Sequence, residues 1–144
     1  MNVKAPAINS GDDTALGAAS PLERSNILIV DDRLDKRVVF RTILEELDQN
    51  IVTASSGEEA LRWLLDNECA VILLDVNMPG MDGLETMKEI RKIPKCKDLP
   101  IVAVTAKAMK GDRERCIEAG AWDYLSKPVD REQLLSVLKA WLQR

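Results

Sequence analysis

The chain has 144 residues, 46% of them hydrophobic, and a formal net charge of −4, which fits one domain and argues against nucleic-acid binding through a clustered basic face. It contains no histidine, the commonest metal ligand, and its three cysteines form no CxxC pair, so neither a zinc site nor a disulfide framework is expected. No apolar run approaches the roughly 18 residues of a membrane span and no signal-peptide pattern is evident, so we expect a cytoplasmic protein without membrane contact.

The first part of the chain predicts no regular structure. Residues 1–24 combine proline, glycine, alanine and serine without sustained periodicity, which indicates a disordered tail or linker. Residues 25–144 are predicted to form one domain, because short apolar runs and helical patterns alternate five times along them. The first run ends at Asp31 and Asp32. The two helical patterns that come next have core faces at Val39, Phe40, Ile43, Leu44 and Leu47 and at Ala60, Leu61, Leu64 and Leu65.

The remaining elements keep this alternation. One buried run ends at Asp75 and precedes a helix with apolar residues at Leu84, Met87 and Ile90. The next run ends at Thr105 and precedes a helix over 112–119 with a glycine stop. Lys127 follows the last short run, and the final helix has its apolar stripe at Leu134, Leu135, Leu138, Trp141 and Leu142. Five successive strand–helix units predict a parallel sheet with helices on both faces.

Polar side chains stand where the predicted strands end, at Asp31, Asp32, Asp75, Thr105 and Lys127. The carboxyl ends of parallel strands line one crevice, so these side chains are expected to converge. Three carboxylates in one place repel each other unless one is protonated or a cation binds, and Mg²⁺ suits such a set of oxygens. An Asp carboxylate can act as a nucleophile on phosphorus, and Asp75 is the candidate. The metal, the ammonium and the hydroxyl would each take one phosphoryl oxygen.

Each of these residues has a structural alternative when taken alone. Asp31 and Asp32 could cap the following helix, and Asp75 could be an ordinary turn residue before a loop rich in glycine and proline. Thr105 and Lys127 are uninformative singly. Their joint occurrence in this order favours the site.

Four motifs carry a resemblance to a known family. They are Ile-Leu-Ile-Val-Asp-Asp at 27–32, Leu-Asp-Val-Asn-Met-Pro-Gly-Met-Asp-Gly at 74–83, Val-Thr-Ala at 104–106 and Tyr-Leu-Ser-Lys-Pro at 124–128. Over about residues 25–143 the chain resembles the receiver domain of two-component response regulators. Residues 99–113 are especially similar to receivers at the C-termini of hybrid histidine kinases. Whether this chain is a stand-alone regulator or part of such a kinase stays open.

The resemblance implies a flavodoxin-like (βα)5 three-layer sandwich with strand order 2-1-3-4-5. It implies Asp75 as phosphoacceptor, and Mg²⁺ held by Asp32, Asp75 and the Asn77 backbone carbonyl, with Asp31 acting through water. Lys127 would contact the phosphoryl group. Thr105 and Tyr124 would form the switch pair. A cis bond would precede Pro128, and Lys107 and Asn77 would influence attacking water.

The implied function is that of a phosphorelay component, not of an enzyme acting on a separate substrate. A sensor histidine kinase or a histidine phosphotransfer protein would donate the phosphoryl group, since the chain itself has no histidine. The fourth helix, fifth strand and fifth helix would form the surface that changes, toward a partner or in a homodimer. Direct binding of nucleic acid is not expected.

Three rival functions make different demands on the sequence. An aspartate-nucleophile phosphohydrolase wants a second Asp two residues after the nucleophile, where this chain has Asn77. A flavodoxin-like FMN carrier wants a phosphate-binding loop after the first strand, where this chain has Asp31 and Asp32. A degenerate receiver would lack the acceptor, metal or lysine positions.

Among the tryptophans, Trp63 is expected as a half-covered surface residue, Trp122 at a strand start, and Trp141 in the core or a dimer seam.

Overall fold

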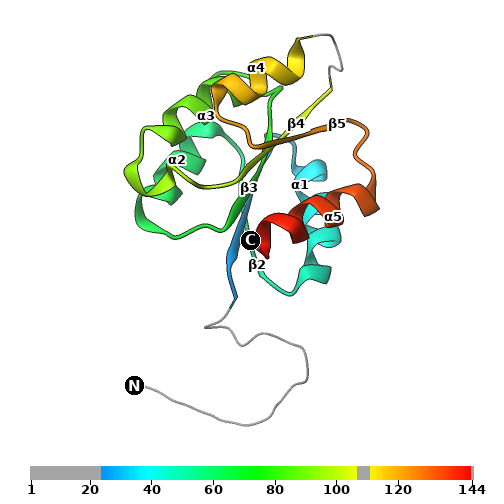
Figure 1. Ribbon diagram of the computed structural model, residues 1–144. Helices are drawn as coiled ribbons and strands as arrows, with labels where there is room; N and C mark the ends of the chain where they lie inside the picture. The colour runs from blue at the N-terminus through cyan, green and yellow to red at the C-terminus, as the bar shows by residue number, and fades with distance from the viewer. Residues whose placement is uncertain (1–23, 107–110, 144) are drawn as a thin grey trace, which may run out of the picture.

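A computed structural model describes residues 24–106 and 111–143, and within them five β-strands alternate with five α-helices (Figure 1). The strands are β1 (Asn26–Val30), β2 (Asn50–Ala54), β3 (Val71–Asp75), β4 (Ile101–Thr105) and β5 (Asp123–Ser126). The helices are α1 (Leu34–Leu44), α2 (Gly57–Asp66), α3 (Gly83–Arg91), α4 (Asp112–Ala119) and α5 (Arg131–Leu142). Two short 3-10 helices complete the described elements, η1 (Glu45–Leu47) and η2 (Pro94–Cys96).

All five strands are parallel and lie in the order β2-β1-β3-β4-β5, which confirms the flavodoxin-like topology expected from the sequence. The register aligns their carboxyl ends. Val30 lies opposite Leu74, and Leu74 lies opposite Ala103. The residues that follow β1 and β3 therefore leave the sheet at the same edge as the end of β4.

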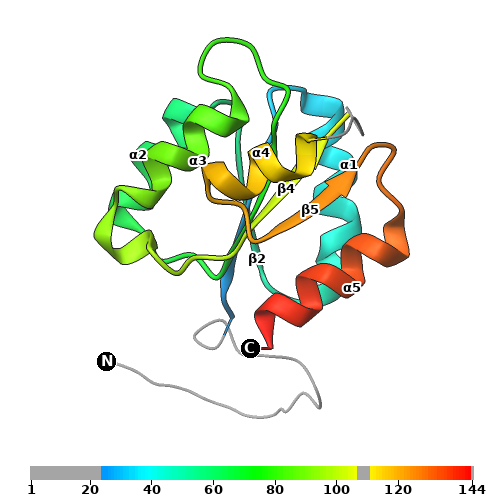
Figure 2. The ribbon, with the colours of Figure 1, turned by 45° about the horizontal axis from the view of Figure 1, so that its top comes forward.

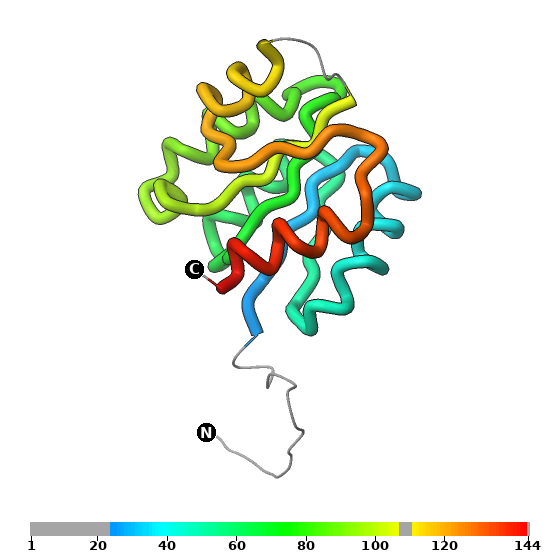
Figure 3. The backbone as a smooth tube through the Cα atoms, turned by 45° about the vertical axis from the view of Figure 1, so that its right-hand side comes forward, coloured from blue at the N-terminus to red at the C-terminus, as the bar shows by residue number. Residues whose placement is uncertain are grey.

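The sheet has an apolar layer on each face, because alternate side chains of a strand point to opposite sides. One layer contains Leu28, Ile72 and Leu74 and packs against α2, α3 and α4. The other contains Ile29 and Leu73 and packs against α1 and α5. Figure 3 shows α5 and α1 on the same side of the sheet. Burial on both faces explains why the strands read as continuous apolar runs rather than as alternating patterns.

Local sequence signals set several helix ends. The Ser56 hydroxyl accepts a hydrogen bond from the Glu59 N–H at 3.1 Å at the start of α2, and the Asp82 and Asp130 carboxylates cap α3 and α5 in the same way. The predicted fourth helix has its expected bounds. It ends at Gly120, whose φ of 127° lies in a region that favours glycine.

The predicted burial of two apolar residues is wrong. Val39 on α1 is 52% exposed and Leu65 on α2 is 61% exposed. Each stands more than a quarter-turn from the centre of its buried stripe, which Phe40 and Leu44 form on α1. The apolar pattern therefore overestimated the width of the buried face. The first helix also ends at Leu44, so Leu47 belongs to η1 and is only partly buried.

The tryptophans lie close to their predicted settings. Trp63 is partly buried against the α2–α4 side of the core. The rings of Trp122 and Trp141 lie 5.5 Å apart between centroids, so the start of β5 packs on α5. The guanidinium of Arg91 lies 5.5 Å from the Trp122 ring centroid.

The tail predicted for residues 1–24 falls outside the described residues, apart from Arg24. Through residues 24–106 and 111–143, no helix has the length and apolar character needed to span a bilayer.

Candidate functional site

The carboxyl edge of the sheet brings three carboxylates together. Asp31 and Asp32 follow β1, and Asp75 is the last residue of β3. Each offers one oxygen atom, and these atoms lie within 4.8 Å of one another. Figure 2 shows the start of α1 and the loop after β3 on the same side of the molecule. No other group of three acidic, histidine or cysteine side chains in the described parts of the chain is arranged to share a metal ion in this way.

Asp31 is the most deeply buried member of this acidic cluster, with 1% of its surface exposed. Its Oδ1 accepts the Arg33 N–H at 3.0 Å, whereas its Oδ2 is buried without a hydrogen-bond partner among the described residues. Burial raises the pKa of Asp31 above 3.8; the Arg33 N–H opposes the rise, and the charge of Asp75 adds to it. A bound cation would stabilise a buried carboxylate oxygen that has no donor. The cluster therefore fits Mg²⁺, which prefers hard oxygen ligands.

Asp75 has a different set of partners. It is 4% exposed, and its Oδ1 accepts hydrogen bonds from the Lys127 ammonium and the Asn77 N–H, both at 3.0 Å. Lys127 reaches this position because its backbone N–H donates to the Thr105 carbonyl at 2.8 Å, which fixes the end of β5 beside β4. The cis peptide bond expected before Pro128 is present.

Gly83 explains how the loop after β3 stays close to the site. A Cβ atom at this position would lie 2.4 Å from the Val76 Cα and 2.6 Å from the Asp75 carbonyl oxygen, so only glycine fits there. The Gly83 N–H donates to the Val76 carbonyl at 3.1 Å. The start of α3 is therefore packed directly against the backbone that carries Asp75.

The Asn77 side chain connects this loop to the end of β4. Its Oδ1 accepts the Ala106 N–H at 2.9 Å and a longer bond from the Thr105 hydroxyl at 3.4 Å. Thr105 itself is fully buried. Asp31, Asp32, Asp75, Asn77 and Lys127 thus meet at one edge of the sheet, with Thr105 directly beside them. Lys107 lies outside the described residues.

One residue that sequence reasoning missed joins the predicted switch pair. Asp112, the first residue of α4, is 3% exposed; its Oδ2 accepts the Tyr124 hydroxyl at 3.2 Å and its Oδ1 accepts the Arg115 guanidinium at 2.8 Å. Burial alone would raise the pKa of Asp112, but interactions with Arg115, Tyr124 and the Thr105 side chain hold it below 3.8. In the sequence, an Asp in the first turn of a helix looks like an ordinary favourable charge.

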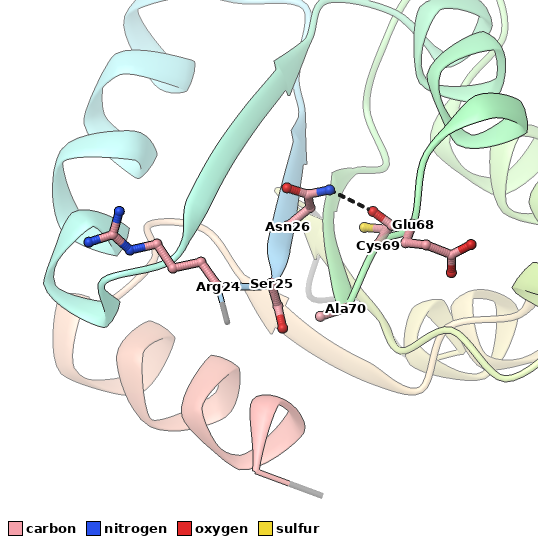
Figure 4. A pocket seen from close by; sticks show the side chains of 6 residues that line it. All are labelled: Arg24, Ser25, Asn26, Glu68, Cys69 and Ala70. Atoms are coloured by element: carbon pink, nitrogen blue, oxygen red, sulfur yellow. Dashed lines mark hydrogen bonds between the residues drawn. The ribbon is translucent and has the colours of Figure 1, made fainter. Parts of the chain in front are cut away.

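The amino edge of the sheet, at the opposite ends of the strands, has a cavity of about 250 Å³ (Figure 4). Its polar groups are largely paired. Asn26 donates its side-chain amide to the Glu68 carbonyl at 2.8 Å, and Arg24 pairs with Asp48 at 2.9 Å, although Nε of Arg24 is buried with no partner in the part of the chain that the structure describes. This cavity does not gather the carboxylates that a cation would need.

Comparison with known proteins agrees with this geometry. Residues 27–139 match the response regulator receiver domain. The uncharacterized 14.6 kDa protein in the sodA1 3'region of Leptolyngbya boryana is 39% identical over 121 residues, which are 83% of this chain and 92% of that protein. The signal transduction histidine-protein kinase BarA of Escherichia coli K12 is 34% identical over 112 residues, which are 78% of this chain but 12% of the kinase.

One solved structure that is similar to this chain contains a bound metal ion. The receiver domain of the sensor histidine kinase PA1611 from Pseudomonas aeruginosa PAO1 has a magnesium ion coordinated in its active site cleft. It is 34% identical to this chain, with a TM-score of 0.78, and the match covers 84% of this chain and 99% of that one.

Proposed function

Because the chain belongs to the response regulator receiver family, we propose that it accepts a phosphoryl group on Asp75 from a phosphohistidine of a partner protein. The observation that carries the proposal is the setting of Asp75, which is buried with the Lys127 ammonium at 3.0 Å and lies in one cluster with Asp31 and Asp32. In the transfer, a carboxylate oxygen of Asp75 forms a bond to phosphorus as the bond from phosphorus to the histidine nitrogen breaks. The departing imidazole keeps that electron pair.

Mg²⁺ is the cofactor we propose for this site, with Asp31, Asp32, Asp75 and the Asn77 carbonyl as its holders. When bound, the ion neutralises charge on the phosphoryl oxygens. Lys127 supplies a second positive charge, and the Thr105 hydroxyl and Ala106 N–H stand at the end of β4 as further donors. Such donors contribute most in phosphoryl transfer, because positioning and charge neutralisation lower its barrier.

The rival reading as a phosphohydrolase receives no support from Asn77. That position would need an acid–base carboxyl group, whereas here an amide oxygen accepts the Ala106 N–H at 2.9 Å. We therefore assign to the chain no reaction beyond its own phosphorylation and dephosphorylation.

The output surface in this proposal is formed by α4, β5 and α5. Tyr124 lies in β5, and its hydroxyl contacts Asp112, the first residue of α4. Thr105 also interacts with Asp112, so a change at Thr105 would be passed to this surface through Asp112 and Tyr124. A partner protein or a second copy of the chain would read the change there. The chain spans nearly all of the Leptolyngbya protein but about one eighth of BarA, so it corresponds both to a small protein and to one part of a large kinase.

Intact-protein mass spectrometry tests the proposal. Incubation with Mg²⁺ and a small phosphodonor should add one phosphoryl group that is stable in acid and labile in base. Asp75→Asn should abolish the addition, because an amide is a poor nucleophile. Asp66→Asn, which removes an exposed carboxylate on α2, is the matched control and should behave like the wild type. Full phosphorylation of the Asp75→Asn variant would show that another residue is the acceptor.

A further inference from the structure

Asp112 stands outside the acidic cluster, yet both residues of the expected switch pair converge on it. Tyr124 donates its hydroxyl to Oδ2 at 3.2 Å, and the Thr105 side chain also interacts with this carboxylate and helps to lower its pKa. Arg115, one turn along α4, donates to Oδ1 at 2.8 Å. The side chain is buried although it is ionisable, so these bonds replace the water that it would otherwise need. The proposed phosphoryl transfer makes no use of this residue.

We propose that Asp112 is a positioning residue that holds the Thr105 and Tyr124 hydroxyls in the unphosphorylated arrangement, so that switching requires its bonds to be given up. This inference rests on the proposed function, because it concerns how phosphorylation of Asp75 is transmitted. It adds a third member to the switch, located at the first residue of α4.

The chemistry of the hydroxyl groups supports a competition. Threonine has a single O–H to donate, and an ionised carboxylate is only an acceptor. The Thr105 hydroxyl can therefore donate to Asp112 or to a phosphoryl oxygen on Asp75, but not fully to both. A phosphoryl group carries up to two negative charges and strong acceptor oxygens, so it competes well for that one proton. The contact of the hydroxyl with the Asn77 oxygen, at 3.4 Å, is long and would have to be given up as well.

The same competition reaches Tyr124. When Thr105 turns toward the phosphoryl group, Asp112 loses one donor, and the space that the threonine side chain occupied becomes available behind β4. The bond from the tyrosine hydroxyl to Asp112 then still links the ring to the start of α4, and Arg115 holds the other carboxylate oxygen. Breaking the bond between Tyr124 and Asp112 is therefore the step that would free the ring to move inward.

The bond between Tyr124 and Asp112 is present only in the unphosphorylated state. It therefore opposes any ligand that favours the switched state, such as the phosphoryl group. Removing it should raise the population of the switched form before any phosphoryl group is bound. A ligand that binds the switched form should then bind more tightly. Its affinity should rise by the same factor as the population of the switched form.

Tyrosine-selective NMR is well suited to the test, because Tyr124 is the only tyrosine in the chain. Spectra are recorded for the free protein and with Mg²⁺ and beryllofluoride, a phosphoryl mimic. In Asp112→Asn, the free-protein signal should lie part of the way toward the beryllofluoride-bound position of the wild type. The mimic should bind several-fold more tightly. Glu118→Gln, which removes an exposed charge from the same helix, is the control and should leave both quantities unchanged.

A double-mutant cycle keeps the test decisive if a single variant is poorly stable. Tyr124→Phe removes the donor and keeps the ring, and calorimetry gives its affinity for beryllofluoride. If the bond between the two side chains is responsible, Tyr124→Phe and Asp112→Asn should each tighten binding, and the double variant should gain little more than either alone. Unchanged affinities or strictly additive effects would overturn the role of Asp112.

Failure of the proposed function would look different. If the wild-type protein neither binds beryllofluoride nor becomes phosphorylated on Asp75, the site assignment itself is wrong. If the wild type responds at Tyr124 but Asp112→Asn responds identically from an identical starting position, only the inference about Asp112 is overturned.

Discussion

Asp31 and Asp112 are two buried carboxylates in opposite situations. Their exposures are 1% and 3%, so the extent of burial does not distinguish them. Among the described residues, one oxygen of Asp31 has no donor, and its pKa is raised above 3.8, whereas Asp112 accepts hydrogen bonds from Tyr124 and Arg115 and has a pKa below 3.8. Burial raises the pKa of both carboxylates, and at Asp112 the hydrogen-bond donors more than offset that rise.

The two carboxylates differ in the charges and hydrogen-bond donors that surround them. Around Asp31 the protein supplies further negative charge from Asp32 and Asp75, and Lys127 is the cation that pairs with the cluster. Around Asp112 it supplies a guanidinium and two hydroxyls. An added cation would stabilise the first arrangement, whereas the second already contains its own positive charge and donors.

Lys127→Met tests the cation of the first region and should have the largest effect. The phosphoryl group would lose its ammonium contact, so the Tyr124 response to beryllofluoride should be largely lost. Magnesium affinity should change by less than about threefold, because removing a neighbouring positive charge does not remove a ligand. Calorimetry and tyrosine-selective NMR on the same sample measure both. A full response at Tyr124 would contradict the assigned role of Lys127.

Asp32→Ala tests whether the first region is a cation site. Losing a hard carboxylate ligand should weaken Mg²⁺ binding by roughly tenfold or more, or about 1.4 kcal/mol. Titration calorimetry measures the affinity. Asp35→Ala, an exposed carboxylate nearby on α1, serves as the control and should bind Mg²⁺ like the wild type. Equal affinities for the wild type and Asp32→Ala would remove Asp32 from the ligand set.

The sequence predicted the first region and missed the second for a physical reason. The acidic cluster is assembled by strand ends, and in a parallel sheet the order of βα units places such ends side by side, so Asp31, Asp32 and Asp75 could be brought together from periodicity alone. The bonds of Asp112 depend on the side-chain directions of Thr105 and Tyr124 across two further elements, which no periodicity encodes. The parallel sheet was predictable in the same way, and the family resemblance added its strand order, whereas the exposure of Val39 and Leu65 was not predictable.

Asp31→Asn should stabilise the protein in the absence of metal by about 2 kcal/mol at neutral pH, because a neutral amide costs less to bury than an unpaired charge. The raised folded-state pKa gives the sign. Wild-type stability is fully present below 3.8 and falls as pH rises through the folded pKa, so the advantage of the variant appears over that interval. Urea unfolding in EDTA across this range measures it. Added Mg²⁺ should reverse the order of stability, since the variant lacks one carboxylate of the proposed metal site.

Asp112→Asn should give the opposite dependence and a smaller effect, about 1 kcal/mol of destabilisation at neutral pH, because the amide keeps one acceptor but loses the charge that strengthens its bonds. The folded-state pKa is lowered here, so the stabilising contribution of Asp112 is present above 3.8 and is lost as pH falls through the folded value. On acidification, the difference in free energy of unfolding between Asp112→Asn and the wild type should therefore shrink toward zero. The difference for Asp31→Asn should shrink as well, but there the variant starts as the more stable protein. Mg²⁺ should leave the Asp112→Asn penalty unchanged, since this carboxylate belongs to the region that is complete without a cation. A Mg²⁺-dependent penalty in the same urea unfolding series would mean that the two regions are energetically coupled even before phosphorylation.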